Sequence, residues 1–336
     1  MAAVPGRQCQ TNRNRCRVWL GVAGVGLLVA SAQAQATKDW PRITFLPHWI
    51  PQAQFAGPFV AADKGIYREH GLDVVVLEGG PRRPVGKWLQ SGEAVMASHF
   101  LSSALKLREE GLPLVNLAQI TQRSALLLVA RKARGIRTVP DLDGKKVSVW
   151  TDFTAQPQAL FRKYELNVRT IPQGPTINVF MRDGVDAVSA MWYNEYHLFL
   201  NSGLNEDELT VFFYDQHGLN FPEDGLYCLE ATWRRYPEVC RQFVAATFEA
   251  WRYVFEHPTE ALDIVLRRTD AARTGTNRSH QRWMLQRMRD LIQPDAARPM
   301  GELTREAYAQ VVRALEESGE LKAAPAFEAF CVGAHP

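Results

Sequence analysis

The sequence predicts an α/β protein that folds into two lobes with a cleft between them. Short apolar runs rich in β-branched residues alternate with runs of helical period, which is the pattern of mostly parallel sheets flanked by helices. The 336 residues exceed the about 250–300 at which a single hydrophobic core stops growing. No Gly- or Ser-rich linker divides the chain, so we expect two lobes joined by short crossings.

The first part of the chain alternates strands and helices. We expect strands at 43–46, 72–77, 94–98 and 114–119, and helices at 53–67 and 101–110. Gly71 ends the first helix, and Gly111 with Pro113 ends the second, because glycine and proline interrupt helical periodicity. Each strand–helix–strand unit is therefore of the βαβ kind.

The second part repeats this pattern and then becomes helical. Further strands are expected at 125–130, 146–150, 168–171, 187–190 and 211–214. From Glu230 onward the composition favours helices, one beginning at Pro237 with an apolar stripe that reaches Val254, and another at 259–268. We expect no strand after Glu230.

These elements give two lobes of unequal continuity. Residues 37–122 and 225–330 form the first lobe, and residues 123–224 form the second, with crossings near 121–124 and 218–225. Clefts at domain interfaces are preferred sites for small ligands, and two crossings permit hinge closure. A ligand site is therefore expected between the lobes.

Residues 1–34 have the features of a secretory signal peptide. A basic region precedes a short apolar run over 18–30 and a small-x-small cleavage pattern; the basic residues are Arg7, Arg13, Arg15 and Arg17, and the pattern is Ala32-Gln33-Ala34. The apolar run is shorter than the about 20 residues that span a bilayer. We expect cleavage and a free periplasmic protein; an uncleaved N-terminal anchor is the alternative.

Charge and cysteine usage narrow the function further. Without residues 1–34 the chain loses four arginines and no acidic residue, so its formal net charge falls from +3 to −1. That balance gives no reason to expect a nucleic-acid or anionic-membrane partner. Three cysteines remain, Cys228, Cys240 and Cys331; either Cys228 pairs with Cys240 or all three are free. Their spacing predicts no metal site.

Two stretches near the N-terminus carry a family resemblance. Residues 49–57 read Trp-Ile-Pro-Gln-Ala-Gln-Phe-Ala-Gly, and residues 61–72 contain Ala-Asp-Lys-Gly-Ile-Tyr followed by Gly-Leu. With Gly184-Val185-Asp186-Ala187 and Tyr193-Asn194-Glu195, they resemble the substrate-binding proteins of ABC importers that are grouped with fungal thiamine-pyrimidine synthases. Binding proteins for sulfonates and nitrate belong to the same group.

The resemblance implies a type II periplasmic binding protein fold and a role in import. The partners would be a small planar, pyrimidine-like heterocycle and an ABC permease with its ATPase. The fungal synthases carry a histidine after Trp-x-Pro where this chain has Phe55, and their cysteine-rich motif is missing here. We therefore expect binding without catalysis, no cofactor, and a monomer.

Several residues follow strands of the first lobe, where open α/β sheets place their ligands. Trp49 can stack on a planar ring of a ligand or cover the hydrophobic core of its lobe. Gln54 can hydrogen-bond a ligand edge or cap a helix, and Phe59 can line the site or belong to the core. Ser98 and His99 occupy an equivalent position after the next strand.

The second lobe supplies the remaining candidates. Asp152 and Phe153 follow the strand that ends near Trp150, and the resemblance places Trp192, Tyr193, Asn194 and Glu195 in one loop. Glu195 is the strongest candidate, because a carboxylate can accept N–H donors of an aminopyrimidine in charge-assisted bonds. Its alternative role is that of a carboxylate at a helix N-terminus.

Three other functions stay open at this point. Arg123 at a predicted crossing could bind a small organic anion instead. The same closure could signal to a membrane partner rather than deliver a ligand. A secreted enzyme is the least favoured, because the sequence lacks a G-x-S-x-G elbow, an H-E-x-x-H helix and a P-loop.

Overall fold

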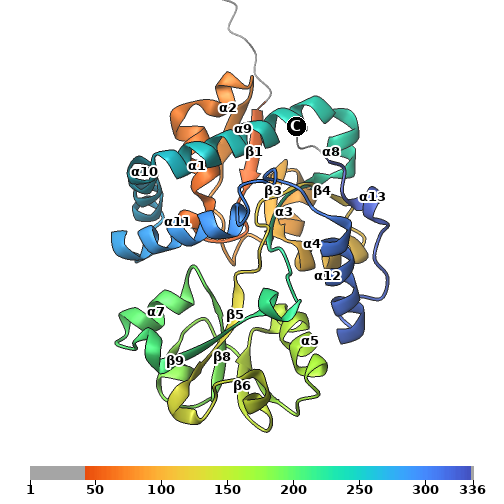
Figure 1. Cartoon of the computed structure of the whole chain (residues 1–336). Coiled ribbons are helices and arrows are strands. Elements are labelled where there is room, and N and C mark those ends of the chain that lie inside the picture. Colours follow the sequence, from red (N-terminus) through yellow and green to blue (C-terminus); the bar gives the residue numbers. More distant parts are fainter. Residues whose placement is uncertain (1–41, 334–336) are drawn as a thin grey trace, which may run out of the picture. The chain divides into compact units, whose positions relative to one another are not determined.

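The computed structural model describes residues 42–333, which lie in one compact unit. Two five-stranded sheets form its framework (Figure 1). In each sheet the pairings leave four strands pointing one way and one strand reversed. The predicted α/β fold with two mixed sheets is therefore confirmed. The predicted signal peptide, residues 1–34, lies outside the described residues.

The first sheet has the strand order β2-β1-β3-β10-β4. Its strands are β1 (Arg42–Leu46), β2 (Asp73–Val76), β3 (Met96–Phe100), β4 (Leu114–Gln119) and β10 (Asp224–Leu229). Strand β1 pairs in parallel with β2 and β3, whereas β10 is antiparallel to both of its neighbours.

The second sheet has the order β7-β6-β8-β5-β9. Its strands are β5 (Leu126–Arg131), β6 (Lys146–Val149), β7 (Arg169–Pro172), β8 (Ala187–Met191) and β9 (Leu209–Phe213), and β5 is the reversed strand. The chain passes between the sheets twice, at 120–125 and 214–223. The predicted lobe boundaries fall in or beside these two crossings and remain a prediction.

Helices flank both sheets. Those nearest the first sheet in sequence are α1 (Ala56–Lys64), α2 (Ile66–Glu69), α3 (Val85–Ser91), α4 (Leu101–Glu109), α8 (Glu230–Arg235), α9 (Pro237–Glu256), α10 (Pro258–Ala271), α11 (Arg278–Ile292), α12 (Arg305–Ser318) and α13 (Phe327–Phe330). The second sheet carries α5 (Ala155–Lys163), α6 (Asn178–Met181) and α7 (Glu195–Asn201). Short 3₁₀ turns are η1 (Ala53–Phe55), η2 (Lys132–Arg134), η3 (Val139–Leu142), η4 (Thr151–Phe153), η5 (Glu206–Glu208) and η6 (Tyr214–His217).

The single helix expected at 53–67 is divided into three pieces. Gly65 adopts the left-handed conformation with φ of 81°, which ends α1 and starts α2. Gly57 lies where α1 packs against α9, and a Cβ atom there would come 2.5 Å from Nε1 of the buried Trp251. These two glycines therefore fix where the helix ends and how closely it approaches α9.

Sequence analysis missed strand β10. It starts with Asp224-Gly225, which is typical of a turn, so this part of the chain was assigned to a crossing. Instead β10 lies between β3 and β4 and its residues 224–228 are buried. The second crossing therefore ends at Glu223, and the chain then enters the middle of the first sheet as β10.

Helix α12 contacts elements that belong to both sheets. It packs against α4, which follows β3, and against α5, which follows β6. Just after α12, Glu320 accepts hydrogen bonds from Lys106 Nζ of α4 at 3.0 Å and from Thr154 Oγ1 at 2.5 Å. Figure 1 shows α12 beside both helices. The C-terminal part of the chain therefore braces one side of the cleft.

The described part of the chain contains three cysteines, and all of them are free. Cys228 and Cys240 are free thiols buried next to each other, and Cys331 is free and half-buried. Of the two alternatives left open by the sequence, the structure has the free thiols.

Across residues 42–333, every helix is too short or too polar to cross a membrane.

Candidate functional site

A cavity of about 820 Å³ lies between the two sheets. Its lining comes from the segments that follow β1, β3, β6, β7 and β8, and from α4. The lining residues are His48, Trp49, Gln52, Gln54, Pro84, His99, Phe100, Ser103, Lys106, Leu107, Glu110, Trp150, Thr151, Asp152, Phe153, Gln173, Gly174, Pro175, Met191, Tyr193, Asn194 and Glu195. The carboxyl ends of these strands meet at this edge, as in other open α/β sheets.

Aromatic rings form much of the wall. The rings of Phe100 and Phe153 lie 4.9 Å apart between centroids, and they come from different sheets. His48 contacts Phe100 at 4.8 Å, and Trp150 contacts Phe153 at 6.3 Å with a perpendicular ring. Trp49 is 40% exposed, so much of its indole is free to contact a ligand. Flat apolar surfaces of this kind suit a planar ring.

A buried cluster of polar side chains lies against the cavity on the side of the first sheet. Ser98 Oγ lies 3.0 Å from His48 Nδ1, and Gln54 Nε2 donates to Asp224 Oδ2 at 2.8 Å. The other carboxylate oxygen, Asp224 Oδ1, is 3.6 Å from His48 Nε2, longer than an ordinary hydrogen bond. Neither Asp224 Oδ1 nor His99 Nδ1 has a hydrogen-bond partner among the described residues.

Burial changes the protonation of this cluster. It raises the pKa of Asp224 to about 8, and the neighbouring Glu223 carboxylate adds to this shift. Burial also lowers the pKa of His48 well below its usual value and that of His99 to about 4. At neutral pH both histidines are therefore neutral, and each imidazole has one N–H donor and one acceptor nitrogen.

The cluster contains the residue types of a nucleophilic triad, but its geometry argues against that role. Ser98 is 1% exposed, and its hydroxyl oxygen accepts the backbone N–H of His48 at 3.1 Å. The Ser98 hydroxyl is therefore covered by His48 and does not line the cavity. Ser98 therefore positions the His48 ring, which does line the cavity.

Glu195 projects into the cavity from the first residue of α7. Its Oε2 accepts the backbone N–H of Met191 at 2.9 Å, and its Oε1 accepts from Asn194 Nδ2 at 2.7 Å. Burial raises the pKa of Glu195, while these two hydrogen bonds oppose the shift. Glu195 therefore begins a helix and also lines the cavity, while its contact with a ligand remains a prediction.

The charge of the lining is negative. One lysine, Lys106, faces three acidic residues, Glu110, Asp152 and Glu195. The Lys106 ammonium already bonds Glu320 and the backbone carbonyl of Asp152. Among the described residues that line this cavity there is no arginine. An anionic ligand would therefore meet repulsion without a free cation.

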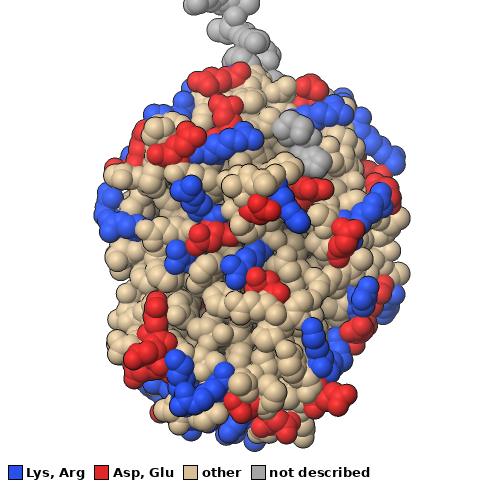
Figure 2. Space-filling model, in the orientation of Figure 1, with Lys and Arg blue, Asp and Glu red and all other residues tan. Residues whose placement is uncertain are grey.

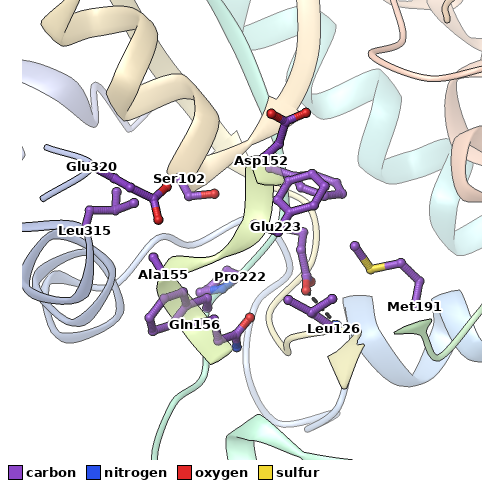
Figure 3. Close-up of a pocket in the computed structure, with 13 residues that line it drawn as sticks. Ser102, Leu126, Asp152, Ala155, Gln156, Met191, Pro222, Glu223, Leu315 and Glu320 are labelled. Atoms are coloured by element: carbon purple, nitrogen blue, oxygen red, sulfur yellow. Dashed lines mark hydrogen bonds between the residues drawn. The ribbon is translucent and has the colours of Figure 1, made fainter. Parts of the chain in front are cut away.

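Glu223 ties the two crossings together beneath the cavity. Its carboxylate accepts the backbone N–H groups of Ala125 at 2.7 Å and Leu126 at 3.0 Å, and the Ser124 hydroxyl at 2.9 Å. Figure 3 shows the Glu223 side chain directed towards Leu126 at the start of β5. Burial raises the pKa of Glu223 to about 7, and these donors oppose the shift. The Glu223 carboxylate thus joins the two crossings.

A second set of contacts crosses the cleft between α11 and the segment that leads into α7. His280 Nε2 lies 2.8 Å from Asn194 Oδ1, and His280 Nδ1 lies 2.9 Å from His197 Nδ1. Trp283 Nε1 donates to the backbone carbonyl of Trp192 at 3.1 Å. On this side, the cleft is therefore closed by hydrogen bonds between uncharged groups.

Most residues predicted for the site line this cavity. They are Trp49, Gln54, His99, Asp152, Phe153, Tyr193, Asn194 and Glu195. Phe59, Ser98 and Trp192 lie elsewhere. Phe59 is 2% exposed in the core and Ser98 is buried under His48, whereas the Trp192 ring packs on Phe213 and the guanidinium of Arg287. As ligand contacts, all of these assignments remain predictions.

Other lining residues were missed from the sequence. His48 immediately follows β1, so its position carried the same signal as Trp49. Gln173 follows β7, and its side chain bonds both the N–H and the carbonyl of Ser189 in β8. Lys106 and Glu110 face the cavity from α4 and its end. Sequence spacing alone gave no sign that this helix borders the cleft.

The surface around the cleft shows no concentration of one charge. Figure 2 shows basic and acidic residues interspersed over the face drawn there. Nucleic-acid-binding surfaces, in contrast, gather Lys and Arg on one face or stripe.

Comparison with known proteins places the chain in a family. The model of the NMT1/THI5-like family matches residues 52–261, which include the first crossing, the second sheet and α9. The chain belongs to the NMT1/THI5-like family. The resemblance inferred from residues 49–57 and 61–72 is thereby confirmed.

Members of this group with curated functions resemble the chain over most of its length. The riboflavin-binding protein RibY of Chloroflexus aurantiacus is 28% identical over 76% of this chain and 74% of its own. The formylaminopyrimidine-binding protein of Halalkalibacterium halodurans is 24% identical over 73% of this chain and 77% of its own. Both relatives are named as binding proteins.

A solved structure confirms the fold. The periplasmic aliphatic sulphonate binding protein SsuA of Escherichia coli matches with a TM-score of 0.67, covering 86% of this chain and 91% of its own at 14% identity. The periplasmic binding protein fold predicted for this NMT1/THI5-like protein is therefore present. At this identity the likeness concerns the fold alone.

Proposed function

We propose that this protein is the periplasmic solute-binding component of an ABC importer, and that it captures a planar aromatic heterocycle between its lobes. The observation that carries the proposal is the lining of the cavity. Aromatic rings from both sheets face a space that also contains three carboxyl groups and neutral histidines. Such a site offers stacking surfaces and acceptors for ring N–H groups.

The same lining disfavours the small anions that structural neighbours bind. Sulfonate or nitrate sites need arginine, hydroxyl or backbone N–H donors. Here Lys106 is committed to Glu320, and Arg123 pairs with Asp215 at 2.6 Å instead of facing the cavity. A phosphorylated heterocycle is disfavoured for the same reason, whereas an uncharged one is compatible with the site.

Capture would occur by closure of the two lobes. A ligand that contacts Trp49 and His48 from the first sheet and Phe153 and Glu195 from the second stabilises the closed form relative to the open one. The two crossings, held by Glu223, would serve as the hinge. The contacts of α11 with the start of α7 would then add to the stability of the closed form.

Binding without chemistry fits both the relatives and the residues. RibY and the formylaminopyrimidine-binding protein each align over about three quarters of the chain. Phe55 stands where the fungal synthases carry a histidine, and it is 3% exposed in the core. The serine of the polar cluster is inaccessible, as described above. We therefore assign no catalytic residue.

A thermal-shift screen of the exported protein tests the proposal. The panel contains riboflavin, formylaminopyrimidine, other uncharged heterocycles, and alkanesulfonates. A ligand at about 100 times its dissociation constant should stabilise the fold by roughly 2.7 kcal/mol. We expect a shift with at least one heterocycle. A shift with alkanesulfonates only would overturn the assignment of the ligand class.

A further inference from the structure

A second cavity of about 210 Å³ adjoins the main one. We call it the side chamber. It is lined by Trp49, Ile50, Pro51, Gln52, Asn194, Leu198, Asn201, Thr274, Gly275, Thr276, Asn277, His280 and Gln281. Its walls are the segment before η1, the loop between α10 and α11, and α7.

The side chamber and the main cavity share part of their walls. Trp49, Gln52 and Asn194 line both. The Gln52 amide nitrogen donates to Gln54 Oε1 at 2.5 Å, and Gln54 lines the main cavity. The two spaces are therefore neighbouring compartments of one site, separated by the half-exposed indole of Trp49.

The two compartments differ in chemistry. The side chamber is lined mainly by amide and hydroxyl side chains, and among its described lining residues there is no lysine, arginine, aspartate or glutamate. Gln281 accepts the N–H of Ala53 at 2.7 Å and donates to Thr276 Oγ1 at 2.9 Å, which fixes its orientation. His280 is hydrogen-bonded at both ring nitrogens.

We infer that the ligand has two parts, a planar ring held in the main cavity and an uncharged, hydroxylated chain that enters the side chamber past Trp49. Amides and hydroxyls both donate and accept, so they match alcohol groups. A charged chain would find no partner of opposite charge among the described lining residues. This inference rests on the proposed function and specifies the class of heterocycle.

The size of the main cavity agrees with a ligand larger than one ring. Cavities of about 300–1,000 Å³ accommodate drug-sized ligands and bury most of their surface. At about 820 Å³ the main cavity lies in the upper part of that range. A single pyrimidine would leave much of this space and all of the side chamber to water.

Three flavins with the same kind of tricyclic ring system test the inference. Riboflavin carries a polyhydroxylated chain, lumichrome has no chain, and flavin mononucleotide has a phosphate at the chain's end. We expect riboflavin to bind at least about tenfold more tightly than lumichrome and than flavin mononucleotide in calorimetric titrations. Equal affinity for riboflavin and lumichrome would overturn the inference.

A variant of the chamber wall locates the effect. Leu198 of α7 lines the side chamber and is 36% exposed, so Leu198→Trp should narrow the chamber without disturbing the core. We expect it to weaken riboflavin binding at least tenfold and to leave lumichrome binding within twofold. Ser202→Trp, at an exposed position just beyond α7 that does not line the chamber, is the matched control. A Leu198→Trp variant that binds riboflavin as the wild type does would contradict the inference.

The remaining outcomes separate this inference from the proposed function. If formylaminopyrimidine binds and no flavin does, the ligand is a single ring and the two-part inference is wrong, although the proposed function stands. If no uncharged heterocycle binds at all, the proposed function itself fails.

Discussion

At the scale of single residues, two carboxyl groups of the candidate site have pKa values raised by burial. Glu195 and Asp224 lie on opposite sheets, and burial raises the pKa of both. Glu195 lines the cavity, whereas Asp224 lies behind it, accepts a hydrogen bond from Gln54 and has Oδ1 3.6 Å from His48 Nε2. The first is therefore a ligand-contact candidate, and the second is a positioning residue.

Replacing the Glu195 carboxylate should weaken ligand binding. Hydrogen bonds to charged groups contribute about 1.5–3 kcal/mol, so we expect Glu195→Gln to lower the affinity for a heterocycle roughly 10- to 100-fold. The variant keeps an oxygen for the Met191 N–H, so its melting temperature should stay close to the wild type. Titration calorimetry measures the affinity, with Glu206→Gln on the exposed turn η5 as control. Unaltered affinity would remove Glu195 from the site.

The raised carboxyl pKa values also predict a pH dependence of stability. Asp224 and Glu223 hold their protons up to about pH 8 and 7 in the folded state, whereas unfolded carboxyl groups ionise near pH 4. Folding thus binds protons, and its stability falls as pH rises through the folded pKa values. The buried histidines contribute in the opposite direction only below about pH 6.5.

We therefore expect the free energy of unfolding to fall between pH 6.5 and 8.5. Urea denaturation at several pH values measures it. Asp224→Asn keeps the shape of the side chain and removes one titrating group, so its slope over this range should be smaller than that of the wild type. A stability that rises from pH 6.5 to 8.5 would contradict the assigned protonation states.

At the scale of elements, the two crossings, which form the proposed hinge, are joined by side chains of one crossing that bind the backbone of the other. Besides Glu223, Asn220 accepts the Ser124 N–H at 2.8 Å and donates to the Gln122 carbonyl at 2.9 Å. Thr121 Oγ1 accepts the Asp224 N–H at 2.9 Å. Because these bonds lie within the hinge, rotation of the lobes need not break them.

Removing the Glu223 carboxylate should destabilise the fold. Glu223→Ala leaves the N–H groups of Ala125 and Leu126 without their acceptor, and each unsatisfied buried donor costs about 1–3 kcal/mol. We expect a loss of about 2–5 kcal/mol in urea denaturation, and a smaller loss for Glu223→Gln, which retains one oxygen. Equal losses for both variants would show that packing, and not these bonds, is responsible.

The contact of Trp283 with the Trp192 carbonyl should slow ligand release. Trp283→Phe removes the N–H donor but keeps a ring against His197. A hydrogen bond contributes about 0.5–1.5 kcal/mol, so we expect the dissociation rate in stopped-flow experiments to rise roughly 2- to 10-fold. Trp233→Phe on α8, remote from the cleft, serves as control. An unchanged rate would mean that this contact is equally present in the open form.

Sequence patterns predicted most strands because strands buried on both faces are continuous apolar runs, such as Leu126–Arg131 and Ala187–Met191. Position after a strand predicted eight of the residues that line the cavity, among them Trp49 and Glu195. Strand β10 was missed because its Asp224-Gly225 start is typical of a turn. The polar cluster around Asp224 was missed for the same reason, since only the reversed strand brings it beneath His48.

At the scale of the whole molecule, the cleft is bounded by three connections of different kinds. The crossings at 120–125 and 214–223 join the sheets covalently, Glu320 after α12 bridges α4 and Thr154, and α11 contacts the start of α7. In the proposed function the first would serve as a hinge, while the other two would have to loosen for a ligand to enter. Ligand binding and lobe closure are therefore expected to be coupled.

The measurement that tests the central claim most directly is a pair of calorimetric titrations of the exported protein, one with riboflavin and formylaminopyrimidine in turn and one with an alkanesulfonate. The account predicts saturable binding of at least one of the two heterocycles and none of the alkanesulfonate, because the lining contains three acidic residues and a lysine that is already paired. Saturable binding of the alkanesulfonate alone would contradict it.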